Sequence, residues 1–316
     1  PGCGDYAILA SMQRALAVQG LAPEKIAFVS GIGCSSRFPY YMDTYGFHTI
    51  HGRAPALATG LKIARPDMQV WVVTGDGDGL SIGGNHLIHV LRRNVNLKLL
   101  MFNNRIYGLT KGQYSPTSEV GKRTKSTPLG SIDHPFSPLV VAVGAEATFL
   151  ARVVDVDAKV MADVLAAAAA HVGTAFVEIL QNCNIFNDGA WESISGKEVR
   201  GDATLTLVDG EPMIFGANRD RGIRLRGFTP EVVRIGDDGV TVDDLWVHDV
   251  SDPDPTRAFI LARMNSPEFP VPVGVLRAVQ RPCYDALVNE QVESVAAGGK
   301  EALRRVLVGN RSWQVS

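Results

Sequence analysis

Residues 69–79 have the sequence QVWVVTGDGDG, and this is the stretch of the chain that decides its fold. Residues 69–74 form a β-branched apolar run without polar alternation, which is typical of a strand covered on both faces. The glycines that follow allow the backbone to approach a ligand closely. A buried strand that ends in a glycine-rich turn predicts a ligand site at the edge of a parallel sheet.

Similar apolar runs alternate with helical patterns through the first 190 residues. The predicted strands are residues 26–30, 69–74, 97–102, 149–154 and 175–180. The predicted helices are residues 5–20, 53–64, 83–93 and 158–171. Strands that alternate with helices predict the α/β class, with a doubly wound and mostly parallel sheet.

Beyond residue 195 the pattern changes to short strand-like segments, separated by Asp-Gly turns at residues 209–210 and 238–239. A short helix is predicted at residues 255–264 and an apolar segment at residues 271–279. We therefore expect an α/β domain over residues 1–195. A smaller β-rich extension over residues 196–316 is expected to pack on that domain and on a partner subunit.

Composition excludes several classes of protein. The chain has 316 residues, 46% of them hydrophobic and 20% charged, and its net charge is −2. This balance excludes a disordered chain and a coiled coil, and it gives no support for binding to nucleic acid. Four cysteines are too few for a disulfide scaffold, and neither a signal peptide nor an apolar run of about 18 residues is visible. We expect a cytoplasmic protein without membrane association.

The sequence at this turn does not match three common ligand-binding motifs. A dinucleotide-binding turn needs a third glycine where Leu80 stands, and no G-x-x-x-x-G-K-[ST] phosphate loop exists. A calcium loop would need glutamate at its twelfth position, which is Leu87. The interpretation that these residues form a plain turn without a ligand stays open at this point.

A fourth interpretation joins Asp76 to Asn104, which follows the predicted strand at residues 97–102. Because the carboxyl ends of parallel strands meet at one edge of a sheet, we expect these two side chains to lie close together. A carboxylate and an amide oxygen suit Mg²⁺, and the glycine backbone can donate N–H groups to phosphates. The pattern therefore predicts a diphosphate–Mg²⁺ site.

Further motifs carry a resemblance to a known family. The chain opens with PGCG (residues 1–4), contains GIGCSS (31–36), and continues after Asn103-Asn104 with IYGLTKGQ (106–113). GDG followed at this distance by Asn-Asn is similar to the signature of thiamine-diphosphate enzymes. The whole set resembles the β subunits of the 2-oxoacid:ferredoxin oxidoreductases, most closely the 2-oxoglutarate type. The resemblance is specific over residues 1–190 and general beyond them.

The resemblance implies that the chain binds thiamine diphosphate and Mg²⁺. It assigns the Mg²⁺ to the side chains of Asp76 and Asn104 and to the backbone carbonyl of Ile106. The residues that it places around thiamine diphosphate are Ile32, Gly33, Cys34, Ser35, His51, Gly75, Gly77, Asp78, Gly108 and Leu109. For His51, a purely structural role stays open.

The resemblance also implies a [4Fe–4S] cluster held by four cysteines. Cys3, Cys34 and Cys183 match three of the ligand positions, and the fourth is expected immediately before Pro1. Cys283 matches no ligand position, so we expect it to be a small buried residue.

The implied reaction converts a 2-oxoacid, CoA and oxidised ferredoxin to acyl-CoA, CO₂ and reduced ferredoxin, and it is reversible. An α subunit is expected to complete the active site in an α2β2 or larger assembly and to help bind CoA, because the glutamate that activates thiamine has no candidate in this chain. Lys111 and Arg37 are the candidate catalytic residues for the distal carboxylate of 2-oxoglutarate, unless they are solvated surface cations. A pyruvate or broad 2-oxoacid enzyme, a non-redox thiamine-diphosphate lyase and an inactive assembly subunit stay as alternatives.

Overall fold

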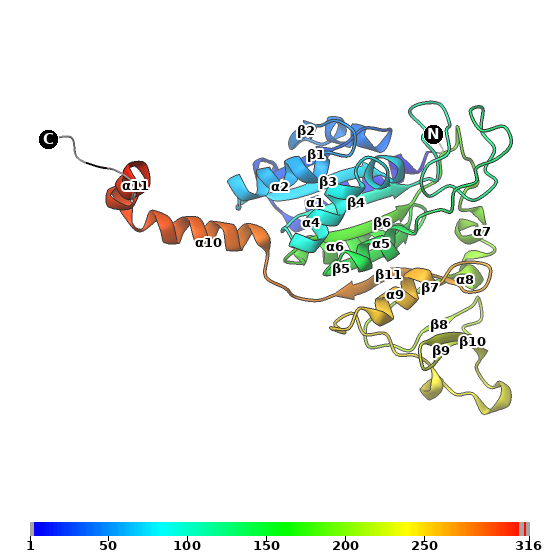
Figure 1. Ribbon diagram of the computed structural model, residues 1–316. Helices are drawn as coiled ribbons and strands as arrows, with labels where there is room; N and C mark the ends of the chain where they lie inside the picture. The colour runs from blue at the N-terminus through cyan, green and yellow to red at the C-terminus, as the bar shows by residue number, and fades with distance from the viewer. Residues whose placement is uncertain (1–2, 310–312, 314–316) are drawn as a thin grey trace.

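The structure is a computed structural model that describes residues 3–309 and residue 313. A sheet of eight strands runs through the centre of the molecule in the order β2-β1-β3-β4-β6-β5-β11-β7 (Figure 1). Its strands are β1 (Ile26–Ser30), β2 (Tyr45–His48), β3 (Gln69–Gly75), β4 (Lys98–Asn103), β5 (Phe149–Val154), β6 (Ala175–Leu180), β7 (Thr204–Thr206) and β11 (Val271–Ala278).

The strand directions confirm the predicted α/β class. All neighbours from β2 to β5 in the sheet are parallel. Strand β11 is antiparallel to β5, and β7 pairs parallel with β11. Strands β3 and β4 are direct neighbours, with Gly75 opposite Phe102. The segments that follow these two strands therefore begin at the same edge of the sheet, which we call the carboxyl edge.

Helices cover both faces of the sheet (Figure 1). On one face lie α1 (Gly4–Gln19) and α6 (Ala158–Ala170), which pack against each other. The other face carries α2 (Ala54–Ala64), α4 (Gly84–Arg93), α5 (Pro138–Gly144) and α9 (Thr256–Arg263).

The two covered faces explain the apolar run at residues 69–74. Val70 and Val72 of β3 belong to the core under α2 and α4, whereas Trp71 and Val73 belong to the core under α1 and α6. Full burial of such a side chain stabilises the fold by about 1.5–3 kcal/mol, so both sides of the strand select apolar residues. The predicted strand therefore has no polar alternation.

The chain beyond residue 195 contributes to two sheets. Strands β8 (Ile214–Phe215), β9 (Arg221–Arg226) and β10 (Thr229–Arg234) form a small antiparallel sheet, which confirms the expected β-rich extension. Strands β7 and β11 join the large sheet instead, so this part of the chain shares a core with the first 195 residues.

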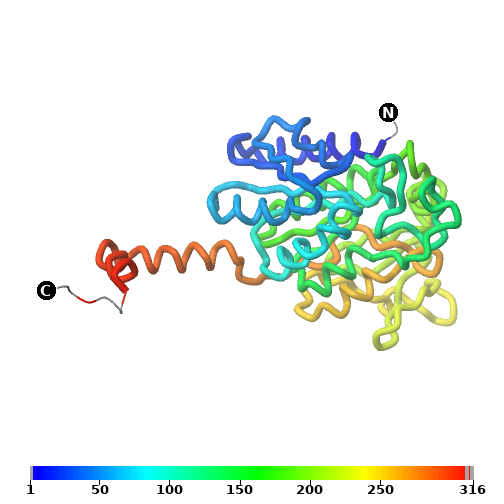
Figure 2. The backbone as a smooth tube through the Cα atoms, turned by 45° about the horizontal axis from the view of Figure 1, so that its top comes forward, coloured from blue at the N-terminus to red at the C-terminus, as the bar shows by residue number. Residues whose placement is uncertain are grey.

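The sequence analysis did not predict the two last helices, α10 (Tyr284–Ala296) and α11 (Gly299–Val308). They lead away from the body of the molecule (Figures 1 and 2). Within α10 the buried residue is Asp285, and α11 buries none, so the apolar residues of these helices, such as Leu303, Val306 and Leu307 of α11, are exposed. Strand β2 was also missed, because its four residues are all exposed. Across the described part of the chain, no helix is long and apolar enough to cross a membrane.

Candidate active site

The glycine-rich segment is a short helix rather than a turn. Strand β3 runs directly into α3 (Asp76–Leu80), with Gly75 in extended conformation before it. A side chain at Gly77 is sterically impossible, because its Cβ would lie 2.2 Å from Cε1 of Tyr107. The Tyr107 hydroxyl donates to the carbonyl of Gly77 at 3.2 Å. The glycine is needed because the loop after β4 lies directly against the helix.

Asp76 is a buried carboxylate at the carboxyl edge, and 2% of its surface is exposed. Its Oδ2 accepts hydrogen bonds from the hydroxyls of Ser115 (2.5 Å) and Thr117 (2.6 Å). Burial raises the pKa of Asp76, and the hydroxyl donors partly oppose this shift. None of the ion pairs between described residues includes Asp76. A buried carboxylate with neutral donors fits a bound cation.

Asn104 lies at the end of the neighbouring strand, as predicted. Its Oδ1 accepts a hydrogen bond from the backbone N–H of Ile106 (3.2 Å), and its Nδ2 donates to Oε1 of Gln181 (2.8 Å). Asp76, Asn104 and Ile106 line one cavity of about 290 Å³. This oxygen-rich set of donors fits Mg²⁺.

All ten residues predicted to contact thiamine diphosphate line the same cavity. The sequence analysis missed four further lining residues, which are Ser81, Ile82, Tyr107 and Thr110. No glutamate of the described chain lines this cavity.

Asp78 lines the cavity, but both of its carboxylate oxygens are already hydrogen-bonded. Oδ1 accepts from the backbone N–H groups of Gly52 (2.7 Å) and Ile32 (3.1 Å), and Oδ2 accepts from the hydroxyl of Thr74 (2.7 Å). A Cβ at Gly31 would lie 1.9 Å from Oδ2, so glycine is required there. Asp78 thus holds three segments of the cavity wall together, and these hydrogen-bond donors satisfy its carboxylate oxygens.

Three of the four cysteines meet beside the cavity. Cys3 precedes α1, Cys34 precedes the 3₁₀ helix Ser35–Tyr41, and Cys183 follows β6. A Cβ at Gly108 would lie 3.5 Å from the Cys34 sulfur and 3.8 Å from the Cys183 sulfur. Burial, the Asp5 carboxylate and the two other thiols raise the pKa of Cys3 to about 11.

This arrangement of thiols fits a cluster better than a single ion. Over residues 3–309, no group of three or more His, Cys, Asp or Glu side chains is placed to hold one metal ion. A [4Fe–4S] cluster instead takes one thiolate on each iron, so its ligands are spread around a larger body. Positive charge from iron would also offset the burial and mutual repulsion that raise the pKa of Cys3 and Cys34. The ligand position expected before Pro1 lies outside the described residues.

The remaining predicted residues lie apart from the thiamine cavity. Lys111 is exposed, has a φ of 75°, and follows Thr110, which lines the cavity. Arg37 is exposed and lines a second cavity of about 260 Å³ together with Cys3 and Cys34. Cys283 is buried at the start of α10, at the opposite edge of the sheet. The structure therefore places Arg37 beside the thiols.

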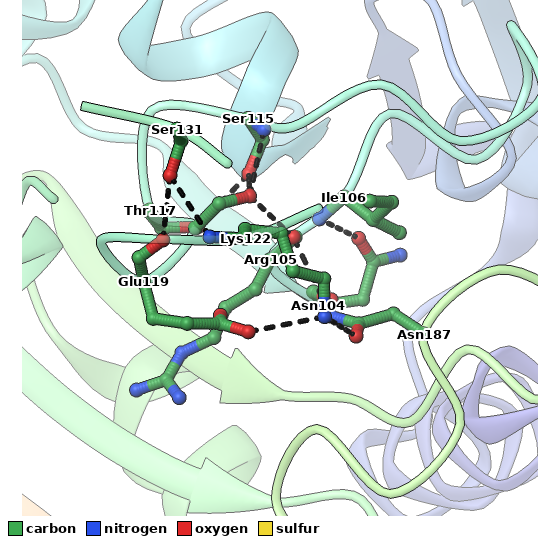
Figure 3. A network of polar contacts seen from close by, with 10 residues as sticks. Asn104, Arg105, Ile106, Ser115, Thr117, Glu119, Lys122, Ser131 and Asn187 are labelled. Atoms are coloured by element: carbon green, nitrogen blue, oxygen red, sulfur yellow. Dashed lines mark hydrogen bonds and ion pairs between the residues drawn. The ribbon is translucent and has the colours of Figure 1, made fainter. Parts of the chain in front are cut away.

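A polar network joins the loop after β4 to the segment that contains Cys183 (Figure 3). Nδ2 of Asn187 donates to the carbonyl of Asn104 at 2.8 Å, and its backbone N–H donates to the carbonyl of Cys183 at 3.0 Å. Lys122 donates to Oδ1 of Asn187 and forms an ion pair with Glu119 at 3.1 Å. The predicted Mg²⁺ ligand and the predicted cluster ligand are thus held by one network.

Comparisons with known proteins agree with this geometry. Residues 31–179 match the family described as "Thiamine pyrophosphate enzyme, C-terminal TPP binding domain". The "2-oxoglutarate oxidoreductase subunit KorB" of Mycobacterium tuberculosis is 54% identical over 319 residues, which cover all of this chain and 85% of that protein. The chain belongs to the β subunits of the 2-oxoacid:ferredoxin oxidoreductases. This confirms the family indicated by the sequence motifs.

Two more 2-oxoacid:ferredoxin oxidoreductases show how far the similarity extends. The "2-oxoacid:ferredoxin oxidoreductase 1, subunit beta" of Aeropyrum pernix is 45% identical over 188 residues, covering 60% of this chain and 59% of that protein. A solved structure, "2-oxoglutarate:ferredoxin oxidoreductase from Magnetococcus marinus with 2-oxoglutarate, coenzyme A and succinyl-CoA bound", is 35% identical. It superposes with a TM-score of 0.77 and covers 98% of this chain and 91% of that one.

Proposed function

We propose that the chain is the β subunit of a CoA-dependent 2-oxoglutarate:ferredoxin oxidoreductase that carries thiamine diphosphate, Mg²⁺ and a [4Fe–4S] cluster. The reaction converts 2-oxoglutarate and CoA to succinyl-CoA and CO₂, and two electrons pass through the cluster to ferredoxin. The reverse reaction fixes CO₂ when ferredoxin is sufficiently reducing. The observation that carries the proposal is that the predicted Mg²⁺ ligands and Cys34 line one cavity, with the thiols of Cys3 and Cys183 beside Cys34.

Different residues of the chain have different roles in the proposed reaction. Thiamine diphosphate supplies an electron sink for the decarboxylation of a 2-oxoacid. Asp76, Asn104 and the carbonyl of Ile106 would hold Mg²⁺ beside the diphosphate, and the α3 backbone would donate to its oxygens. Cys34 borders both the thiamine cavity and the second cavity at the thiols. Thiamine diphosphate in the first cavity and a cluster at the second would therefore both lie against Cys34.

Substrate choice is assigned to the cations near the cavity. Lys111 follows a lining residue, and its ammonium group can approach the distal carboxylate of 2-oxoglutarate. Arg37 lies on the side of the thiols, where a guanidinium can bind a carboxylate in a bidentate manner. The KorB relative at 54% identity supports the choice of 2-oxoglutarate over pyruvate.

The described chain does not supply the group that activates the thiamine ring. Since the cavity lining of the described chain contains no glutamate, the group that activates the thiamine ring would come from a partner. We assign this role to an α subunit in an α2β2 or larger assembly, which also helps to bind CoA. The whole complex is proposed to work in the cytoplasm.

The decisive experiment is anaerobic purification of the chain together with its α subunit, followed by iron and thiamine diphosphate analysis and a panel of 2-oxoacids. We expect about four iron atoms per β chain and the highest kcat/KM for 2-oxoglutarate in the presence of CoA and ferredoxin. A colourless and fully active complex would instead identify a non-redox lyase. A higher kcat/KM for pyruvate would overturn the choice of substrate, and a complex without turnover would indicate an assembly subunit.

A further inference from the structure

Gln181 connects the two halves of the proposed site through a single side chain. It is the first residue after β6 and is 1% exposed. Its Oε1 accepts a hydrogen bond from Nδ2 of Asn104 at 2.8 Å, and its Nε2 donates to the sulfur of Cys3 at 3.5 Å. One amide therefore contacts a proposed Mg²⁺ ligand on one side and a proposed cluster ligand on the other.

The side chain of Gln181 is held firmly in this orientation. Its second Nε2 hydrogen is donated to the backbone carbonyl of Asn182, and its own backbone N–H donates to the carbonyl of Asn103 at 3.0 Å. A Cβ at Gly4 would lie 2.8 Å from Cγ of Gln181, so the stem of the side chain is closely packed. Both amide hydrogens and the amide oxygen have partners, so a rotation of this side chain would break several hydrogen bonds.

We propose that Gln181 is a positioning residue that fixes the amide of Asn104 for Mg²⁺ and raises the reduction potential of the iron–sulfur cluster. The inference rests on the proposed function and extends it to a residue outside both predicted ligand sets. Because Gln181 Oε1 accepts from the NH₂ group of Asn104, the Asn104 oxygen is turned away from Gln181 and is kept available to a metal. This is the way in which outer hydrogen-bond partners orient metal ligands in proteins.

The effect on the cluster follows from charge. An N–H group that donates to a ligand sulfur stabilises negative charge, and the reduced cluster carries one more negative charge than the oxidised cluster. The hydrogen bond from Gln181 to Cys3 therefore favours reduction and shifts the potential upward.

Two substitutions separate the two roles. Gln181→Glu keeps an oxygen that accepts from Asn104 and removes the donor to Cys3. Gln181→Met keeps the volume and removes both hydrogen bonds. A matched control is Gln69→Glu, because Gln69 also accepts a side-chain hydrogen bond, from Trp71 at 2.9 Å, at the far end of β3.

The test uses the anaerobically purified αβ complex and measures two quantities. The first is the affinity for thiamine diphosphate at a fixed Mg²⁺ concentration. The second is the midpoint potential of the cluster, from a redox titration that is followed by electron paramagnetic resonance. We expect Gln181→Glu to lower the potential and to keep the affinity within about twofold. Gln181→Met is expected to lower the potential by less and to weaken the affinity about 10-fold. Gln69→Glu should change neither quantity.

An unchanged potential and affinity in Gln181→Met would overturn the inference, even if the buried carboxylate of Gln181→Glu prevented assembly. A wild-type complex without iron would overturn the proposed function instead, so the two failures are distinguishable.

Discussion

The two edges of the central sheet both contain buried polar side chains, but they satisfy them in different ways. At the carboxyl edge, Asp76 accepts from neutral hydroxyls and lines a cavity, and the thiols of Cys3 and Cys34 have raised pKa values. At the amino edge, Lys98 is 3% exposed and donates to backbone carbonyls of His171 and Gly173. Neutral groups satisfy both charges, but Asp76 lies among residues predicted to bind a cofactor, whereas Lys98 links its strand to the segment before β6.

The amino edge repeats this pattern at a second lysine. Lys62 is 5% exposed, and its Nζ donates to the carbonyls of Pro66 (2.8 Å) and Met68 (2.7 Å). Burial lowers the pKa of Lys62 and lowers that of Lys98 to about 8. Lys62 and Lys98 also line a cavity, of about 350 Å³. A buried charge at a cavity therefore does not by itself mark a functional site, and the carboxyl edge is distinguished by the predicted ligand residues that gather there.

The largest expected effect is at Asp76. Asp76→Asn keeps the shape of the side chain and removes the charge that would bind Mg²⁺, so thiamine diphosphate affinity should fall by more than about 100-fold. The melting temperature should stay the same or rise, because a buried carboxylate without a cationic partner is removed. Calorimetric titration with thiamine diphosphate and Mg²⁺ measures the first quantity. Retained affinity would show that Asp76 is not a metal ligand.

Lys98→Met tests the opposite edge. The substitution leaves the carbonyls of His171 and Gly173 without their donor, and we expect the free energy of unfolding to fall by about 2–4 kcal/mol. Urea denaturation followed by circular dichroism measures this loss. Thiamine diphosphate affinity should not change, and a large loss of affinity would contradict the division between the two edges.

Thr117→Val sharpens the comparison within the carboxyl edge. Thr117 is 4% exposed, and its hydroxyl contacts Oδ2 of Asp76 at 2.6 Å and Oδ1 of Asn103 at 2.9 Å. Loss of the hydroxyl should weaken Mg²⁺-dependent thiamine diphosphate binding by about 10-fold or somewhat more. Thr117→Ser should restore the binding, and Thr124→Val, at a half-buried position of the same loop, is the control.

The smallest effect concerns the pH dependence of stability at the amino edge. Burial and the neighbouring Lys98 lower the pKa of His171 to about 4. Between that pH and the unfolded pKa of about 6.5, the unfolded chain binds more protons, so this residue reduces stability as pH falls through that range. We expect the loss between pH 7 and pH 5 to be smaller in His171→Gln by roughly 1 kcal/mol, after allowance for solvent screening. Equal losses in urea denaturation of the two proteins would refute this prediction.

The parts of the fold that the sequence predicted are those in which burial leaves a local pattern. Strands β3, β4, β5 and β6 are covered on both faces, so each is a continuous apolar run. Strand β2 and helix α11 bury no residue and were not predicted, although Leu303, Val306 and Leu307 of α11 follow helical spacing. The short helix α3 was interpreted as a turn, because four of its five residues are glycine or aspartate, which usually mark turns.

The residues of the candidate site also divide into those that could be predicted from the sequence and those that could not. Asp76 and Asn104 could be paired from the sequence, because each directly follows a strand and parallel strands end at one edge. Ser115, Thr117, Gln181 and Asn187 could not, since they are polar residues in segments without periodicity. Arg37 and Lys111 were assigned from their motifs, and the structure places both outside the cavity lining.

The sequence by itself determined the α/β class and the family, and it predicted the edge of the sheet that carries the site and the types of ligand. These properties depend on the alternation of strands and helices along the chain, on glycines and on the chemistry of single side chains, all of which leave local patterns. Only the tertiary structure decided that Asp78 holds the cavity wall, that Ser115 and Thr117 support Asp76, and that Gln181 contacts both Asn104 and Cys3. Hydrogen bonds form between groups that folding brings within about 3 Å of each other, and residues far apart in the chain give no local sign of such contacts.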